Sequence, residues 1–282
     1  GDSEYEAFLP RAGIIYDFDD DKSLSFVVQR GYRAGGLYIF TDEDTEIQEV
    51  RSFDAEFLTN YELAWRSVWF DDRLTVNANA FFSTWEDQQV RVQVPGSIEP
   101  EIFNVGESEL YGLEIETYYD VSPDWNIYAS LGLVQTEFTD FPFAIDEAGD
   151  PVNMMDPTFA NLAGNEFSSA PNITGALGVS YDSGSGFFGS ANLSFRGEQF
   201  SDVTNLEINK TDSYAIVNAR FGYQQDTWRI SAVIDNLFDD KFLRTNLLQE
   251  VDPDTGLVDN AGIGRNNVSQ PRFIGIEIEA EF

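Results

Sequence analysis

The chain is 282 residues long and carries 16 basic and 50 acidic side chains, which gives a formal net charge of −34 at pH 7. It contains no cysteine and no histidine, which excludes disulfide scaffolds, thiol nucleophiles, Cys/His zinc sites and catalytic triads that need imidazole. The acidity argues against a nucleic-acid partner, because neutralising phosphates requires a basic surface.

Apolar and polar residues alternate with the period of a β-strand along most of the chain, and no long stretch follows the helical period. Clear examples lie at 74–83, 111–119, 215–224, 228–235 and 273–282. No apolar run reaches the roughly 20 residues that a membrane-spanning helix needs. The first residues also lack the basic and apolar regions of a signal peptide.

The connections between these segments alternate in length. Short polar turns are expected at Asp19–Lys22, Asp71–Asp72, Ser122–Asp124, Ser183–Gly186 and Gln225–Asp226. Long, acidic connections are expected at Ala34–Ser52, Pro95–Ile102, Thr139–Ala170, Ser201–Thr211 and Asp239–Gln270. This alternation is typical of an outer-membrane barrel, with short periplasmic turns and long extracellular loops. Counting the segments predicts about eleven strands, many of them longer than the about 9–11 residues that cross a bilayer.

We therefore predict an all-β fold, an antiparallel up-and-down transmembrane β-barrel. The alternative is a soluble, acidic β-sandwich or jelly roll, whose strands also alternate. A sandwich does not require every second connection to be long, and it does not explain aromatic residues at the strand ends. Lipid-facing girdles do account for the aromatic residues beside the short turns, which are Trp69, Tyr119, Trp125, Tyr181, Tyr223 and Trp228.

Several short segments occur in an order known from one family. They are Leu-Pro-Arg-Ala-Gly at 9–13, Gln-Arg-Gly-Tyr-Arg-Ala-Gly-Gly at 29–36, Phe-Leu-Thr-Asn-Tyr-Glu-Leu at 57–63, Asn-Val-Gly-Glu-Ser at 104–108, Tyr-Gly-Leu-Glu at 111–114, Asp-Asn-Leu-Phe-Asp at 235–239 and Gln-Pro-Arg at 270–272. Across residues 1–282 the chain resembles the C-terminal half of the barrel of a TonB-dependent outer-membrane receptor of the iron-complex type.

This resemblance implies a 22-stranded barrel whose lumen is filled by a plug domain. The chain shows no plug, no TonB box and only about half of those strands, so we expect it to be part of a longer receptor. Pairing of the first strand with the last in a small closed barrel would contradict this expectation.

The resemblance also implies a function, namely active transport of a bulky, scarce nutrient across the outer membrane of a Gram-negative bacterium. A ferric siderophore is the first candidate for the ligand, while cobalamin, oligosaccharides and other metal chelates stay open. The implied partners are outer-membrane lipid and lipopolysaccharide, the plug, TonB and the barrel assembly machinery. The alternatives are a passive porin or adhesin-type barrel, and a secreted β-sandwich with binding loops.

Two groups of residues are candidates for functional contacts. The alternating terminal strand, with Ile274, Ile276, Ile278 and the final Phe282, resembles the signal that the assembly machinery reads, although it can equally be a closing strand that faces lipid. Polar residues expected to face the lumen, where they contact the plug or the ligand, are Arg66, Glu114, Glu116, Arg196, Arg220, Arg229, Glu277 and Glu279.

Other motifs give weaker indications. The acidic clusters at Asp42–Asp44 and Asp252–Gly256 could bind calcium, but neither completes an EF-hand loop. Glu114 and Glu116 are spaced like paired catalytic carboxylates, yet nothing in the sequence indicates the tuned pKa values that an enzyme needs. The Asn236–Asp239 segment is interpreted as a bend at a strand end. We therefore predict no enzymatic activity and no cofactor.

Overall fold

The computed structural model describes residues 7–41, 48–92, 101–143, 160–247 and 265–280. Its main element is one sheet of 11 strands, each antiparallel to its neighbours in the sheet. In order they are β1 (Arg11–Asp19), β2 (Lys22–Arg33), β5 (Glu56–Trp69), β6 (Leu74–Val92), β7 (Glu101–Ser122), β8 (Trp125–Asp140), β11 (Ile173–Asp182), β12 (Phe187–Arg196), β15 (Tyr214–Gln225), β16 (Trp228–Asp235) and β19 (Phe273–Ala280). The predicted strand number is confirmed.

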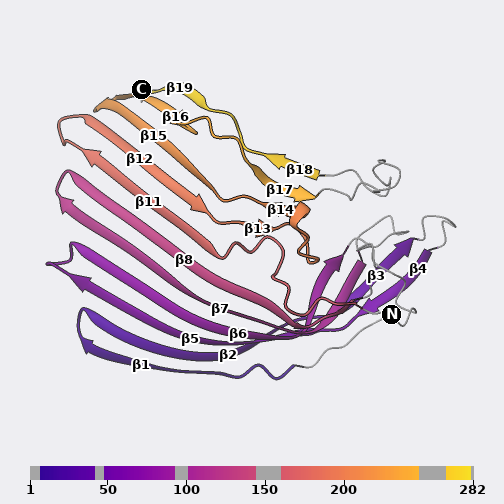
Figure 1. The fold of residues 1–282 in the computed structure, drawn as a ribbon. Helices are drawn as coiled ribbons and strands as arrows, with labels where there is room; N and C mark the ends of the chain where they lie inside the picture. Colours follow the sequence, from indigo (N-terminus) through magenta and orange to yellow (C-terminus); the bar gives the residue numbers. More distant parts are fainter. Residues whose placement is uncertain (1–6, 42–47, 93–100, 144–159, 248–264, 281–282) are drawn as a thin grey trace, which may run out of the picture.

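The sheet forms a single curved layer (Figure 1). Strands β1 and β19 stand at opposite ends of the strand order, and among the described residues they do not pair with each other. The described strands therefore do not close into a small barrel. No helix in the described parts of the chain has the length and apolar character needed to cross a membrane.

All five short turns lie at one end of the sheet, which we call the short-turn end, on the left in Figure 1. Their sequences explain their tightness. In the first turn Asp19 accepts a hydrogen bond from the backbone N–H of Asp21 (3.0 Å), and in the fourth Gly184 and Gly186 adopt positive φ angles of 62° and 106°.

The long connections lie at the other end, which we call the long-connection end. They contain four small two-stranded sheets that the alternation did not reveal, because most of these strands are too short to show a period. The pairs are β3 (Gly36–Thr41) with β4 (Gln48–Phe53), β9 (Pro142–Phe143) with β10 (Ala160–Asn161), β13 (Gln199–Phe200) with β14 (Lys210–Thr211), and β17 (Leu243–Leu247) with β18 (Arg265–Val268). A single 3-10 turn, η1 (Glu207–Asn209), precedes β14.

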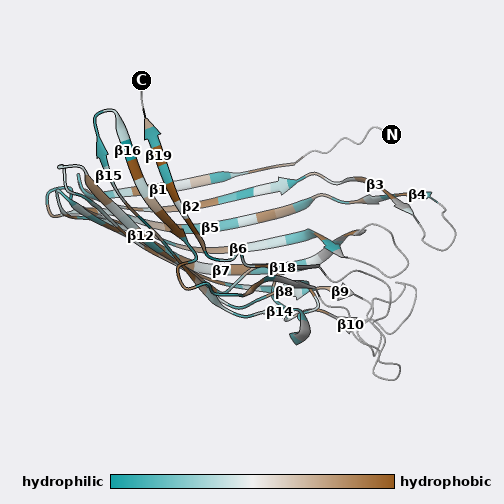
Figure 2. Cartoon of the chain, turned by 90° about the horizontal axis from the view of Figure 1, so that it is seen from above, coloured by the Kyte–Doolittle hydropathy of each residue, from teal (hydrophilic) through white to brown (hydrophobic). Residues whose placement is uncertain are grey.

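One face of the sheet is apolar and exposed. The register aligns Leu63 of β5 with Ala80 of β6, then with Leu113 of β7 and Leu133 of β8, so one row of apolar side chains crosses the strands. Leu63 is 45% exposed and Ile276, on β19, is 73% exposed. Hydrophobic and hydrophilic positions alternate along the strands (Figure 2). No second sheet covers this row in the described structure, so the β-sandwich alternative is wrong.

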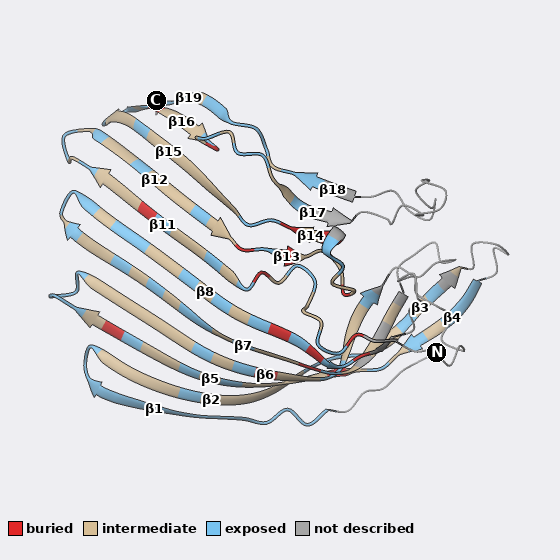
Figure 3. Ribbon diagram, in the orientation of Figure 1, coloured by how far each residue is buried: buried red, intermediate tan, exposed pale blue. Residues whose placement is uncertain are grey.

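The buried apolar core is small and lies at the long-connection end. It consists of Phe138, Phe141, Leu162 and Val203, against which Phe167 packs. Figure 3 shows that buried residues gather where β8 meets the long connections, while most of the sheet is exposed or intermediate. A soluble domain of this length would hide much more apolar surface, so this burial pattern fits a sheet whose apolar face meets lipid.

Candidate functional site: the polar face and the rim of the sheet

The eight polar residues expected to face the lumen share the face opposite the apolar row. Arg66 and Glu116 both flank Asn77 in the register, and Glu114 pairs with Asn79. On the far strands Arg229 pairs with Glu279. Since side chains alternate between the two faces of a sheet, the remaining members follow from the same register. They are Arg196, Arg220 and Glu277.

Three of the four basic members of this face have partners among the described residues. The guanidinium of Arg220 forms an ion pair with Glu277 across β16 (Nη2 to Oε2, 2.7 Å). The guanidinium of Arg229 lies over the ring of Phe188, 4.0 Å from the centroid. Arg196 donates to a backbone carbonyl of the β8–β11 connection at 3.2 Å. These contacts hold the three arginines along the wall of the sheet.

The acidic members on β7 differ. Glu114 and Glu116 are exposed, and neither forms a hydrogen bond or an ion pair with a described residue. This part of the polar face therefore presents two carboxylates that have no partner among the described residues.

Aromatic rings on the polar face lie against glycines of the next strand. Phe81 pairs with Gly112 and Phe188 pairs with Gly222. A Cβ atom on Gly112 would stand 2.5 Å from Cζ of Phe81, and one on Gly222 would stand 2.6 Å from Cζ of Phe188. Glycine at these positions lets each ring lie over the backbone of the adjacent strand.

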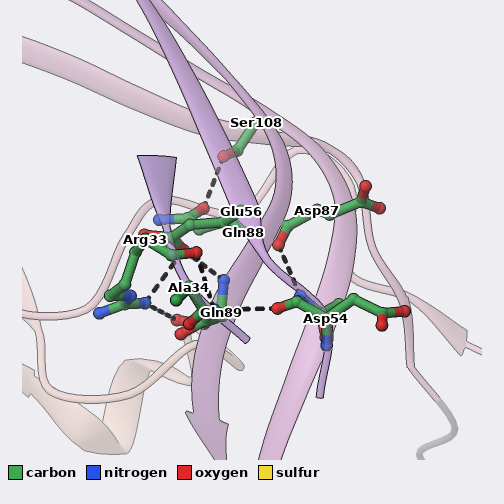
Figure 4. Close-up of polar contacts among 9 residues, drawn as sticks. Arg33, Ala34, Asp54, Glu56, Asp87, Gln88, Gln89 and Ser108 are labelled. Carbon is green, nitrogen blue, oxygen red and sulfur yellow. Dashed lines mark hydrogen bonds and ion pairs between the residues drawn. The ribbon is translucent and has the colours of Figure 1, made fainter. Parts of the chain in front are cut away.

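At the long-connection end a polar network joins β2, β5, β6 and β7 (Figure 4). Glu56, 9% exposed, accepts hydrogen bonds from Arg33 (3.0 Å) and from the backbone N–H of Gln89 (2.6 Å). The side chain of Gln89 donates to the carbonyls of Ala34 (3.0 Å) and Asp54 (2.9 Å). The network thus ties both ends of the β3–β4 hairpin to the sheet.

Aromatic residues on the apolar face form a row beside the short turns. The rings of Trp125 and Tyr181 lie 4.6 Å apart and those of Tyr223 and Trp228 lie 5.8 Å apart, centroid to centroid. Phe187, which the sequence analysis did not single out, joins this row at 4.8 Å from Tyr223. Their place on the apolar face at one level is that of an interfacial girdle.

A family model described as "TonB dependent receptor-like, beta-barrel" matches residues 1–237 of the chain. The chain belongs to the TonB-dependent receptor family. The expected family and the barrel fold are thereby confirmed, and the family is one of receptors rather than enzymes.

Several solved structures share the fold of this chain. The ferric yersiniabactin uptake receptor FyuA from Yersinia pestis superposes with a TM-score of 0.73 at 21% identity, covering 96% of this chain and 37% of that one. The ferripyoverdine receptor of the outer membrane of Pseudomonas aeruginosa gives 0.63 at 16%, covering 99% and 33%. The copper transporter OprC gives 0.62 at 15%, covering 96% and 39%. At these identities the likeness shows the fold, and the chain spans between 33% and 39% of each protein.

The terminal strand of this TonB-dependent receptor chain is β19. Ile274, Ile276 and Ile278 lie on the apolar face, between 66% and 73% exposed, and β19 pairs only with β16 among the described residues. Phe282 lies outside the described residues. The roles expected for this strand in assembly, and for the polar face in plug or ligand contact, stay predictions.

Two further expectations concern the connections. Both acidic clusters considered for calcium, Asp42–Asp44 and Asp252–Gly256, lie outside the described residues, and the described residues hold no group of three or more potential metal ligands. The Asn236–Asp239 segment is a bend, as interpreted from sequence. Asn236 and Asp239 adopt positive φ angles of 51° and 57° directly after β16.

Proposed function

We propose that the chain is the C-terminal part of the barrel wall of an outer-membrane active transport receptor, and that residues 1–282 contain no plug domain. The observation that carries this proposal is the single-layered antiparallel sheet with one exposed apolar face and one polar face, in a chain of the TonB-dependent receptor family. The apolar face contacts lipid and the polar face lines the lumen.

The aromatic residues give the thickness of the lipid-facing band. On β7 the band runs from Tyr111 to Tyr119, and Tyr111 aligns with Phe82 and Tyr61 on the neighbouring strands. At about 3.3 Å per residue and a tilt of about 40°, these eight steps span about 20 Å across the membrane. The apolar band of known outer-membrane barrels is about 25 Å tall, so these backbone steps account for most of that height.

The polar face contacts the plug of the complete receptor. The free carboxylates of Glu114 and Glu116 require cationic or hydrogen-bonding partners on the plug, since they have none on the sheet. Substituting both with glutamine weakens seating of the plug and raises the permeability of cells to large, normally excluded antibiotics. Glu137→Gln is the matched control, because the register places Glu137 on the opposite face. Equal permeability of the two variants would contradict plug contact.

The ligand is a metal chelate, and a ferric siderophore is the first candidate. The names of FyuA and of the ferripyoverdine receptor refer to ferric siderophores, which supports iron, whereas OprC is a copper transporter, which makes a copper complex the second candidate. TonB drives uptake by acting on the plug.

Transport assays with a strain lacking the full-length receptor test this function. Uptake of radioactive iron from a panel of ferric siderophores is expected to fall to background for at least one chelate, and restoring the receptor restores it. Repeating the assay without TonB separates active transport from a passive porin, since a porin conducts without energy. Unchanged uptake of every iron and copper chelate would refute the proposed function.

A further inference from the structure

Three asparagine side chains at the long-connection end each bind one backbone unit through both of their polar atoms. Asn104 accepts from the N–H of Asp54 (2.7 Å) and donates to its C=O (2.9 Å). Asn205 does the same with Glu166, at 2.6 and 3.0 Å. We call these two side chains, and a third described below, the carboxamide clamps.

The third carboxamide clamp is Asn236. It accepts from the N–H of Asp240 (3.0 Å) and donates to the C=O of the same residue (2.9 Å). Its amide also donates to the carbonyl of Gln270 (3.0 Å), near the other end of the β16–β19 connection. The side chain is 5% exposed, so these contacts are shielded from water.

Each clamp makes the same two hydrogen bonds as a hydrogen-bonded residue pair in an antiparallel sheet. A carboxamide has a donor and an acceptor on the same edge, and so does a backbone residue in a strand. The side chain can therefore take the place of a neighbouring strand where the chain leaves the sheet and its ladder ends. Each clamp satisfies two backbone groups that would otherwise need water.

Each clamp acts at a different connection. Asn104 of β7, assisted by Gln89 of β6, holds Asp54 beside β4 and Ala34 before β3, which are the two ends of the β3–β4 hairpin (Figure 4). Asn205 joins the β12–β15 connection to the β8–β11 connection. Asn236 closes the root of the β16–β19 connection.

We propose that Asn104, Asn205 and Asn236, with Gln89, are positioning residues that preset the roots of the long connections. This inference rests on the proposed function in one respect, since it takes these connections to be the ligand-binding side of the receptor. The rim is then preorganised, and a ligand meets connections whose roots are already ordered. Because the clamps are uncharged, salt does not loosen them, whereas it screens an ion pair with one exposed partner, such as that of Arg33 with Glu56.

Pulsed electron paramagnetic resonance on the full-length receptor tests the best-defined clamp. These 282 residues contain no cysteine. With any cysteine elsewhere in the receptor replaced by serine, Val50→Cys on the β3–β4 hairpin and Leu113→Cys on the apolar face provide two specific sites for spin labels. With native clamps we expect a narrow distance distribution that is the same at low and high salt. Substituting Gln89 and Asn104 together with alanine should broaden it about twofold, because the hairpin root loses its fixed partners.

Matched controls separate the clamps from general effects of losing an amide. Asn172→Ala and Gln225→Ala each remove a carboxamide that clamps no connection, and both should leave the distribution narrow. Asn104→Asp keeps the acceptor but loses the donor, so its distribution should lie between those of the native and doubly substituted receptors. Heat resistance of the folded barrel reports that every variant has folded.

The proposal fails if the doubly substituted receptor keeps the narrow distribution. It also fails if Arg33→Gln alone broadens the distribution as much, because the ion pair and not the carboxamides would then hold the hairpin. No ligand is needed for this measurement. A negative result in the distance measurement therefore does not contradict the proposed transport function. A negative result in the transport assay likewise does not contradict the role of the clamps.

Discussion

A charged residue placed at the middle of the apolar band tests whether this face meets lipid. Ile115 lies midway between Tyr111 and Tyr119 on β7, and its neighbours in the register are Ala78 and Leu131. Ile115→Arg places a guanidinium at the depth where arginine in a transmembrane barrel costs about 2–4 kcal/mol. The same substitution on a face exposed to water would change stability by less than about 0.5 kcal/mol.

The size of the effect therefore separates the two environments. The full-length receptor is folded into lipid vesicles, and its free energy of unfolding is measured by denaturant titration followed by tryptophan fluorescence. Ser130→Arg is the matched control, because Ser130 pairs with Glu116 on the polar face and is not among the residues proposed to contact the plug. The same side chain there should change the free energy of unfolding by less than about 1 kcal/mol. Equal costs at positions 115 and 130 would refute the assignment of the faces.

Three further substitutions have defined outcomes. Gly178→Ala forces the ring of Tyr128, which packs on Gly178, to move, and should lower the free energy of unfolding in vesicles by about 1–3 kcal/mol. Gly31→Ala is the control, because nothing lies within 4 Å of the added methyl group, and it should not lower this free energy. The hydrogen bond that the Lys210 ammonium donates to Glu198 raises the pKa of Lys210, so Glu198→Gln should lower this pKa in nuclear magnetic resonance titrations of labelled lysine. A raised pKa stabilises the fold fully below the unfolded-state value of about 10.4, and this stabilisation is lost as pH rises to the folded-state pKa. In the variant the stabilisation should therefore be smaller and its loss complete at a lower pH. Ile276→Asp should reduce the amount of heat-resistant receptor in outer-membrane fractions, and an unchanged amount would argue against an assembly role for the terminal strand.

The faces of the strands could be predicted from the sequence because each depends on a local pattern. Leu113 and Glu114 are adjacent, and the period of two assigns them to opposite faces before any partner strand is known. The short turns were equally local, since aspartate, serine and glycine specify tight turns through their own side chains or backbone freedom. The register then follows from aligning the apolar rows.

The carboxamide clamps could not be predicted in the same way. Asn104 and Asp54 are 50 residues apart, and Asn205 and Glu166 are 39 residues apart. No period or spacing marks such a contact, because it forms only when separate strands bring the connections together. The position of Asn236 directly after a strand indicated the bend. It did not indicate that the Asn236 side chain also donates to the carbonyl of Gln270.

The upper limit of the lipid-facing band shows how the same face serves two environments. On β6 the aromatic residue Phe82 is followed on the apolar face by Thr84 and Glu86, and Glu86 forms an ion pair with Arg30 (2.8 Å). A charged pair on this face would be costly in hydrocarbon, so the strands beyond Phe82 must stand above the bilayer. The roots that the carboxamide clamps hold lie on this raised part of the wall, where water competes for backbone groups. Internal hydrogen bonds at that level hold the described roots of the long connections where lipid no longer confines the wall.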